Sequence, residues 1–337
     1  MNDKIKIGVV GAGIYGKHHI DTYLRLNEVE EVIVCDTNSV QLESFTKEYG
    51  LKGYSSVNKM VNNVKLDAVS ICTPDPYHFE PLKDAINGGI KNILCEKPLT
   101  TSSEQANEIR ELAEKNNVNI FIDFHKRWDP AYNAIRDKIK INNDKIIRGY
   151  MSLDDIIDVP LNWFNWTEKS SPAWFVGTHC VDLMRYITES EVTKVYATAN
   201  KGVLKKHGID VYDNISALLT FSDGSNWALE NNWILPNSYP KSNDGQLVIV
   251  TDKQYFKNES YRGLKTYDES GASLPNYIFM NYEENKASGF GLEPMIDFVH
   301  NIVYGSEVRA DLYDGIETTK IIEAIHYSVE TGEVIFF

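Results

Sequence analysis

The stretch Ile5-Lys6-Ile7-Gly8-Val9-Val10-Gly11-Ala12-Gly13-Ile14-Tyr15-Gly16 decides the fold of this chain. A short apolar run typical of a buried strand leads directly into a GxGxxG string, and a helical segment follows. In that arrangement the first glycine permits a tight turn, the second allows a pyrophosphate close to the backbone, and the third lets the helix pack on the strand. We therefore predict a dinucleotide site formed by residues of this string: Gly11, Gly13, Ile14, Tyr15 and Gly16. A glycine-rich turn that binds nothing is the alternative.

Apolar and amphipathic segments alternate from this string to residue 124, which is typical of βαβ units on a parallel sheet. The expected strands are 5–10, 32–35, 68–72, 93–95 and 120–124, and the expected helices are 39–49, 80–87 and 101–116. We predict that residues 1–124 form a Rossmann domain that binds NAD(P).

The pattern changes after residue 124. Helices are expected at 131–141 and 177–188, and strands at 146–153, 192–199, 215–221, 226–233 and 247–251. The Asp223-Gly224 pair indicates a hairpin turn, and two helices, 294–304 and 315–331, are expected near the end. We predict an α/β protein in which residues 125–337 form an α+β domain for substrate binding and oligomerisation, with a large, mostly antiparallel open sheet.

The overall composition limits the class of protein. The chain has 337 residues, a net charge of -14, and 42% hydrophobic residues. A soluble globular protein of two domains is expected, with neither nucleic acid nor a membrane as partner. The four cysteines are far apart in sequence, and we expect buried thiols in the cytoplasm rather than disulfides or a metal site.

Asp36 bears on the choice of cofactor because it ends the second expected strand, 20 residues after Gly16. A carboxylate at this place accepts hydrogen bonds from ribose hydroxyls and repels a 2′-phosphate. NAD is therefore favoured as the cofactor and NADP is left open. The alternative is that Asp36 only caps the end of the strand.

Two later strings give the chain a family resemblance. Thr73-Pro74-Asp75-Pro76-Tyr77-His78 follows one strand, and Glu96-Lys97-Pro98 follows the next. These strings resemble the Thr-Pro…His segment and the Glu-Lys-Pro signature of the Gfo/Idh/MocA family of sugar and cyclitol dehydrogenases. The resemblance implies that Thr73, Pro74, His78 and Glu96 contact the cofactor, and that Lys97 contacts both the cofactor and the reacting oxygen of the substrate. A surface lysine paired with Glu96 is the alternative.

The segment Gly177-Thr178-His179-Cys180-Val181-Asp182 resembles the family's Gly-x-His-x-x-Asp string. An imidazole suits the proton transfer that accompanies hydride transfer. We expect His179 to be catalytic and to bind substrate, and Asp182 to assist it; a structural histidine is the alternative. Many family members have an aspartate four residues before the histidine, where this chain has Phe175, so the family's lysine-aspartate-histidine triad is not complete here.

The junction between the expected domains, Phe124-His125-Lys126-Arg127-Trp128, is also similar to the family's. We expect Lys126, Arg127 and Trp128 to face the substrate, as we expect of Phe175; solvated cations at a domain joint are the alternative. The aromatic residues Trp163, Phe164, Trp166, Trp174 and Phe175 are expected to form core or a subunit contact more readily than a wall over a sugar ring.

The resemblance spans essentially the whole chain and implies an oxidoreductase that interconverts a hydroxyl and a carbonyl on a sugar, sugar derivative or cyclitol. It also implies a homodimer or homotetramer formed through the C-terminal sheet. Two alternatives are a glycosidase that uses NAD transiently with no net redox change, and a non-catalytic NAD-sensing regulator. Phe175 favours the sensor, whereas Lys97 and His179 argue against it.

Overall fold

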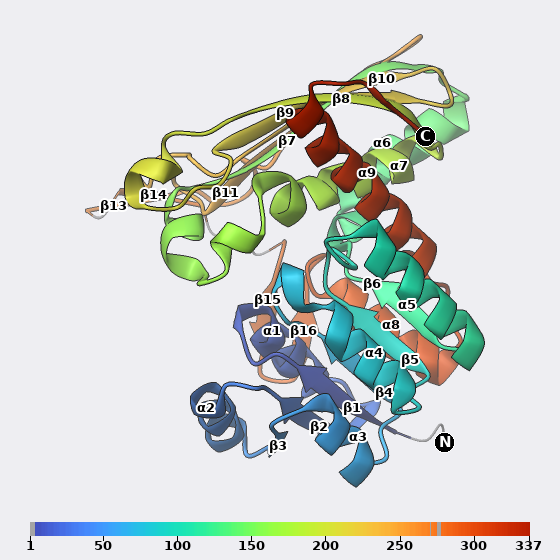
Figure 1. Cartoon of the computed structure of the whole chain (residues 1–337), viewed down its shortest axis with the longest axis vertical. Helices are drawn as coiled ribbons and strands as arrows, with labels where there is room; N and C mark the ends of the chain where they lie inside the picture. Colours follow the sequence, from blue (N-terminus) through green and yellow to red (C-terminus); the bar gives the residue numbers. More distant parts are fainter. Residues whose placement is uncertain (1–3, 270, 275–277) are drawn as a thin grey trace. The chain divides into compact units, whose positions relative to one another are not determined.

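The computed structural model describes residues 4–269, 271–274 and 278–337. The chain divides into two compact units (Figure 1). The first unit contains Met1–Trp128 and Ile278–Thr319, and the second contains Asp129–Tyr277 and Lys320–Phe337. No described helix is long and apolar enough to cross a membrane.

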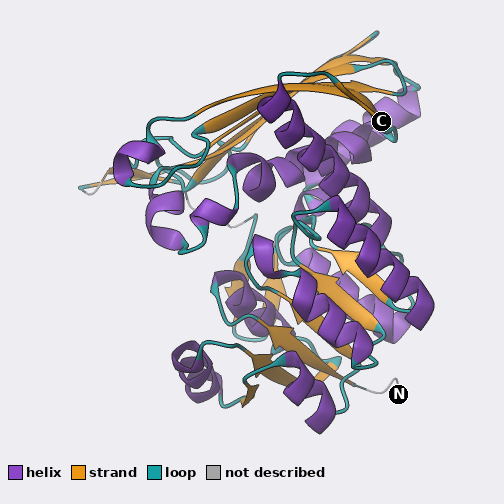
Figure 2. Cartoon of the chain, viewed as in Figure 1, coloured by secondary structure: helices purple, strands orange, loops and turns teal. Residues whose placement is uncertain are grey.

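The first unit is built on a parallel sheet of six strands in the order β3-β2-β1-β4-β5-β6. This strand order is that of a doubly wound dinucleotide-binding fold. The strands are β1 (Ile5–Val10), β2 (Val29–Cys35), β3 (Lys52–Tyr54), β4 (Ala68–Ile71), β5 (Asn92–Cys95) and β6 (Asn119–Ile122). The central strands are almost wholly buried, since helices cover both faces of such a sheet (Figure 2).

Some helices of the first unit begin at a residue whose side chain caps them. The helices of this unit are α1 (Ile14–Tyr23), α2 (Ser39–Tyr49), α3 (Val57–Asn63), α4 (Phe79–Asn87), α5 (Ser103–Asn116) and α8 (Glu293–Tyr304), with short 3-10 turns η1 (Asp75–Tyr77) and η2 (His125–Trp128). At the start of α2, the Asn38 side chain accepts hydrogen bonds from the N–H groups of Val40 and Gln41. The helix ends at Gly50, whose φ of 68° is the left-handed conformation that favours glycine.

Helix α8 packs with the first unit although it lies far along the chain. Its Phe298 ring meets Phe121 of β6 edge to face, with ring centroids 5.1 Å apart, and Leu292 and Met295 are buried in the same apolar cluster. The sequence-based division at residue 124 places this helix in the second domain. The contacts group Ile278–Thr319 with the first unit instead, because the apolar face of α8 completes the core beside β6.

The second unit is an α+β structure around a mixed sheet of seven strands in the order β12-β11-β7-β10-β9-β8-β17. Among the strands of this sheet in the described part of the chain, only β7 and β10 pair in parallel. The strands are β7 (Ile146–Asp155), β8 (Val192–Asn200), β9 (Asn214–Phe221), β10 (Asn226–Asn232), β11 (Asn243–Thr251), β12 (Tyr255–Glu259) and β17 (Ile335–Phe336). The predicted large, mostly antiparallel sheet is confirmed.

The helices of the second unit bury one face of this sheet (Figure 2). They are α6 (Pro130–Asn142), α7 (Thr178–Thr188) and the second part of α9 (Leu312–Thr331); the first part of α9 belongs to the first unit. Shorter turns are η3 (Val159–Trp163), η4 (Thr167–Lys169), η5 (Ala173–Gly177) and η6 (Leu204–His207), and small hairpins are formed by β13 (Thr266–Asp268) with β14 (Gly271–Ser273) and β15 (Asn281–Glu283) with β16 (Lys286–Ser288).

Candidate active site

The three glycines of the GxGxxG string occupy three different environments. Gly11 has a φ of +99°, and a Cβ added there would lie 2.7 Å from the Cys72 carbonyl oxygen. A Cβ on Gly16 would lie 1.8 Å from the Gly11 carbonyl oxygen, so α1 packs directly on the loop. A Cβ on Gly13 would meet no heavy atom within 4 Å. The space beside Gly13, at the N-terminus of α1, fits the close approach of a pyrophosphate. Ile14 is exposed and Tyr15 half-buried at the start of the helix.

Asp36 follows β2 and is tied to the same loop. Its Oδ2 accepts a hydrogen bond from the Ala12 N–H at 2.7 Å, and its Oδ1 accepts one from the Asn38 N–H at 2.7 Å. Asp36 therefore caps the end of the strand, as the alternative interpretation expected. Because each carboxylate oxygen has two lone pairs, this role leaves acceptor capacity for a ribose hydroxyl.

The loops after β4 and β5 are joined through His78. The buried imidazole lies 2.6 Å from the Thr73 carbonyl oxygen through Nε2 and 2.5 Å from the Pro98 carbonyl oxygen through Nδ1. The Thr73 hydroxyl donates to the Tyr77 carbonyl oxygen at 2.9 Å. The contacts of His78 thus hold the two loops that carry Pro74 and Lys97. Direct contact of Thr73, Pro74 and His78 with the cofactor stays a prediction.

Glu96 and Lys97 follow β5 at the carboxyl edge of the parallel sheet, and both are about 5% exposed. Glu96 Oε1 lies 3.1 Å from His19 Nε2 of α1. Burial alone would raise the pKa of Glu96, but the hydrogen bond with His19 and the positive charges of His19, Lys97 and His125 outweigh it and lower that pKa. The alternative, a surface lysine paired with Glu96, is therefore not what the fold forms, since both side chains are buried.

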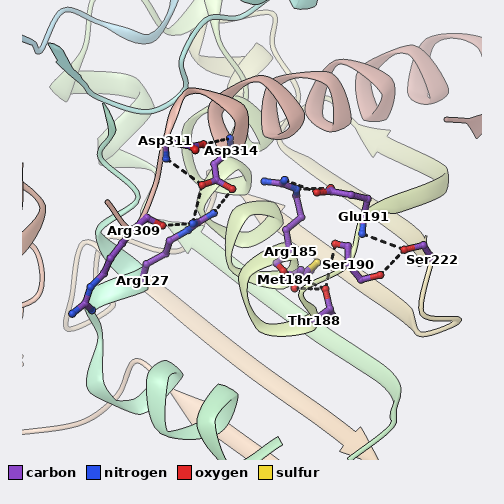
Figure 3. A network of polar contacts seen from close by, with 10 residues as sticks. All are labelled: Arg127, Met184, Arg185, Thr188, Ser190, Glu191, Ser222, Arg309, Asp311 and Asp314. Carbon is purple, nitrogen blue, oxygen red and sulfur yellow. Dashed lines mark hydrogen bonds and ion pairs between the residues drawn. The ribbon is translucent and has the colours of Figure 1, made fainter. Parts of the chain in front are cut away.

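Arg127 is held by acceptors of the first unit. Its Nη1 and Nη2 lie 2.9 and 2.8 Å from the two carboxylate oxygens of Asp314, and Nη1 also donates to the Arg309 carbonyl oxygen (Figure 3). Trp128 donates from Nε1 to Asp297 at 2.6 Å. None of the three side chains is fully solvated, because Arg127 is buried and Lys126 and Trp128 are half-buried. Contact of these three residues with substrate stays a prediction.

His179 and Asp182 lie on α7 of the second unit, and both are buried. A π-helical turn, η5, runs directly into this helix, and such turns occur often at functional sites. Ser171 anchors the turn: its hydroxyl accepts from the Trp174 N–H at 3.1 Å and lies 2.7 Å from His326 Nε2. At its other end α7 is tied down by Arg185, whose Nε and Nη2 each lie 2.7 Å from Glu191 (Figure 3).

Phe175 projects from η5 into an aromatic cluster of the second unit. Its ring centroid lies 4.8 Å from that of Phe164, 6.0 Å from Trp166 and 6.1 Å from Trp233. Trp174, by contrast, is buried in the main core and stacks on His326, and Trp163 is 45% exposed. Trp174 fits the expectation of core, and a subunit contact for exposed Trp163 stays a prediction.

A buried polar cluster that includes Glu96 was not predicted from the sequence. The cluster brings together one nitrogen or carboxylate oxygen from each of His19, Glu96 and Asp123, all within 4.8 Å of one another. His125 Nδ1 lies 3.6 Å from Asp123 Oδ1. Asp123, an acid inside the apolar run Ile120–Phe124, was the available signal. The four cysteines are buried, as expected, and burial raises the pKa of Cys35 to about 12.

Comparison with known proteins identifies the family of both parts of the chain. Residues 5–124 match an oxidoreductase family with an NAD-binding Rossmann fold, and residues 146–257 match the GFO/IDH/MocA C-terminal domain. The D-glucoside 3-dehydrogenase of Escherichia coli is 24% identical over 97% of this chain and 96% of its own length.

Solved structures share the fold across the whole chain. The myo-inositol 2-dehydrogenase of Lactobacillus plantarum superposes with a TM-score of 0.84 at 21% identity, covering 99% of this chain and 100% of its own. The scyllo-inositol dehydrogenase of Lactobacillus casei, solved with NAD(H) and scyllo-inositol, has a TM-score of 0.81 at 20% identity and covers 99% of both chains.

Proposed function

Since the chain belongs to the Gfo/Idh/MocA family of oxidoreductases and carries its NAD-binding Rossmann domain, we propose that it interconverts a hydroxyl and a carbonyl on a sugar, sugar derivative or cyclitol. The observation that carries the proposal is the burial of Glu96 and Lys97 at the carboxyl end of β5. Ligands of open parallel sheets bind beyond this edge, and the glycine-rich loop after β1 opens at the same edge.

NAD, when bound, supplies the acceptor or donor of the hydride. The residues of the chain align the substrate and handle its proton. Lys97 donates a hydrogen bond to the reacting oxygen, and His179 takes the hydroxyl proton in the oxidising direction. Asp182, one helical turn from His179, favours the charged imidazole.

Asp36 supports NAD rather than NADP as the cofactor. Its carboxylate is fixed by the Ala12 and Asn38 N–H groups, so its negative charge stays at the end of β2. A 2′-phosphate at this place would be repelled, whereas ribose hydroxyls would donate to the remaining lone pairs. Similarity to glucoside and inositol dehydrogenases supports a polyol ring as substrate.

Phe175 supports a substrate with one apolar face. It stands where many family members have an aspartate, and its ring belongs to the cluster with Phe164, Trp166 and Trp233. The CH-rich face of a sugar or cyclitol packs well on aromatic rings. Without a carboxylate at this position, proton transfer depends on His179 and Asp182.

A panel of inositols, glucosides and free sugars tests the proposal through reduction of NAD followed by absorbance. We expect one class of polyol to be oxidised by the wild type, and Lys97→Met and His179→Ala to lower kcat at least about 100-fold. The matched control is Lys91→Met, because Lys91 is exposed at the opposite end of β5.

The other outcomes separate the alternatives. Full turnover by both Lys97→Met and His179→Ala would refute the assigned roles. Cleavage of a glycoside without net NADH formation would support the glycosidase. Cofactor binding with neither reaction on any panel member would support the sensor.

The second unit also supports the proposed homo-oligomer. A row of apolar side chains crosses five strands in register on one face of the sheet: Tyr196, Leu218, Ala228, Tyr150 and Val248. Leu218 is 62% exposed and Tyr196 is 40% exposed. The helices of the second unit bury the other face. A second copy of the chain covers this row in the proposed dimer or tetramer.

A further inference from the structure

A network of buried ionisable groups lies beneath the Glu96-Lys97 motif. His19 of α1 is 0% exposed, Asp123 at the end of β6 is 1% exposed, and Glu96 is 5% exposed. His19 Nε2 lies 3.1 Å from Glu96 Oε1 but 3.8 Å from Asp123 Oδ2. His19 is therefore hydrogen-bonded to Glu96 and only near Asp123.

Asp123 differs from Glu96 in what surrounds its oxygens. Among the described residues, neither oxygen of Asp123 accepts a hydrogen bond of normal geometry. The nearest imidazoles are at 3.6 Å (His125) and 3.8 Å (His19). A carboxylate anion buried without donors is costly, so the protonated acid is favoured. Burial, and then the charge of Glu96, raise the pKa of Asp123 well above its usual value.

The other titratable neighbours do not supply the missing charge. Tyr23 of α1 lies 3.4 Å from His19 Nδ1 and 2.6 Å from the Ser70 hydroxyl of β4, and burial raises its pKa far above 10.0. Burial also raises the pKa values of the thiols that flank the network, Cys72 after β4 and Cys95 on β5. The groups left to balance the two carboxyls near neutral pH are His19, His125 and Lys97. Half-buried His18, directly before His19 on α1, adds little positive charge because burial lowers its pKa.

We propose that this network holds one proton on Asp123 at neutral pH, and that its loss at higher pH shifts the preference of the site from reduced toward oxidised NAD. His19 acts as the positioning residue, because its bond to Glu96 keeps that carboxylate, rather than Asp123, in the ionised form. The inference rests on the cofactor half of the proposed function and is independent of the substrate.

The direction of this shift in cofactor preference follows from the charge of the nicotinamide ring. The oxidised nicotinamide ring is positive and the reduced ring is neutral, so a new negative charge beneath Glu96 and Lys97 stabilises the oxidised form relative to the reduced form. The ratio of the NAD+ dissociation constant to the NADH dissociation constant should therefore fall as Asp123 ionises. We expect a fall of about threefold or more.

The test measures both dissociation constants from pH 6 to pH 9 by calorimetry and NADH fluorescence. The wild type should show the fall with a single midpoint. In Asp123→Asn, which preserves the shape of the side chain and removes the titration, the ratio should keep its low-pH value throughout. The matched control is Asp67→Asn, since Asp67 is exposed at the amino edge of the same sheet; it should titrate like the wild type.

A second variant, His19→Gln, and a second measurement, Tm, keep the inference testable if one variant does not bind nucleotide. His19→Gln keeps a donor for Glu96 but cannot become charged. It should therefore shift the pH midpoint of the ratio of the two dissociation constants. Asp123→Asn should also raise Tm relative to the wild type at pH 9 more than at pH 6, because the wild-type stability supplied by neutral Asp123 is lost as pH rises through its folded pKa. The inference would be overturned if folded Asp123→Asn kept the pH dependence of the wild type, or if the ratio in the wild type did not depend on pH. Either result would leave the proposed function intact. Absence of binding by either nucleotide would overturn the proposed function as well.

Discussion

Two roles of the glycine string, cofactor binding at Gly13 and helix packing at Gly16, can be separated by adding one methyl group at each position. A Cβ on Gly13 meets no heavy atom within 4 Å, whereas a Cβ on Gly16 would lie 1.8 Å from the Gly11 carbonyl oxygen. We predict that Gly13→Ala impairs cofactor binding in a stable protein, and that Gly16→Ala damages the fold itself.

The structure sets the size of each effect. Gly13 has φ -89° and ψ -162°, an extended conformation open to any residue, so Gly13→Ala should change the free energy of unfolding by no more than about 1 kcal/mol. For Gly16→Ala, the loop or α1 must move to relieve the overlap, and such overpacking costs about 1–3 kcal/mol. In a unit of this size, that cost lowers Tm by about 2–12 °C.

Thermal unfolding and NADH fluorescence titration measure the two effects on the same samples. The methyl group of Gly13→Ala would occupy the space beside the N-terminus of α1, and we expect NADH affinity to fall at least about tenfold, or 1.4 kcal/mol. Wild-type affinity in Gly13→Ala would refute the assignment of this space to the pyrophosphate. A wild-type Tm in Gly16→Ala would refute the packing argument.

Three further predictions concern other parts of the chain. Arg127→Lys should lower the free energy of unfolding by about 1–3 kcal/mol in urea titrations, because lysine cannot form the paired bonds to Asp314; an unchanged midpoint would contradict it. Burial, and then the negative charge of Asp244, raise the pKa of Asp154 to about 7, so its contribution to stability is lost as pH rises from about 4 to 7. Asp154→Asn should therefore gain Tm relative to the wild type at pH 8 but not at pH 4, and an equal difference at both would refute this. Leu218→Glu should lower the oligomeric state in sedimentation experiments without changing the circular dichroism spectrum, and an unchanged assembly would exclude this face as the interface.

The elements of secondary structure could be predicted well because most carry local signals. The helix Ser39–Tyr49 has the bounds expected from Asn38 before it and Gly50 after it. The observed strands differ from the expected ones by a few residues at their ends. The short strand β3 and helix α3 were missed, since their runs are too brief to show a period. The hairpins β13–β14 and β15–β16 were missed for the same reason.

Local sequence determined the glycine-rich turn, the parallel sheet and the strand ends that carry Asp36 and Lys97, because tight turns, buried runs and helix caps depend on neighbouring residues. Only the tertiary structure showed that α8 completes the core of the first unit and that Arg127 is paired with Asp314. It alone brought His19, Glu96 and Asp123 together beneath Lys97. His19 lies on α1, whereas Glu96 and Asp123 follow β5 and β6, and the ionisation of each depends on burial and on charges supplied by the others. No local pattern contains that information, since the free energy of a buried charge is set by everything packed around it.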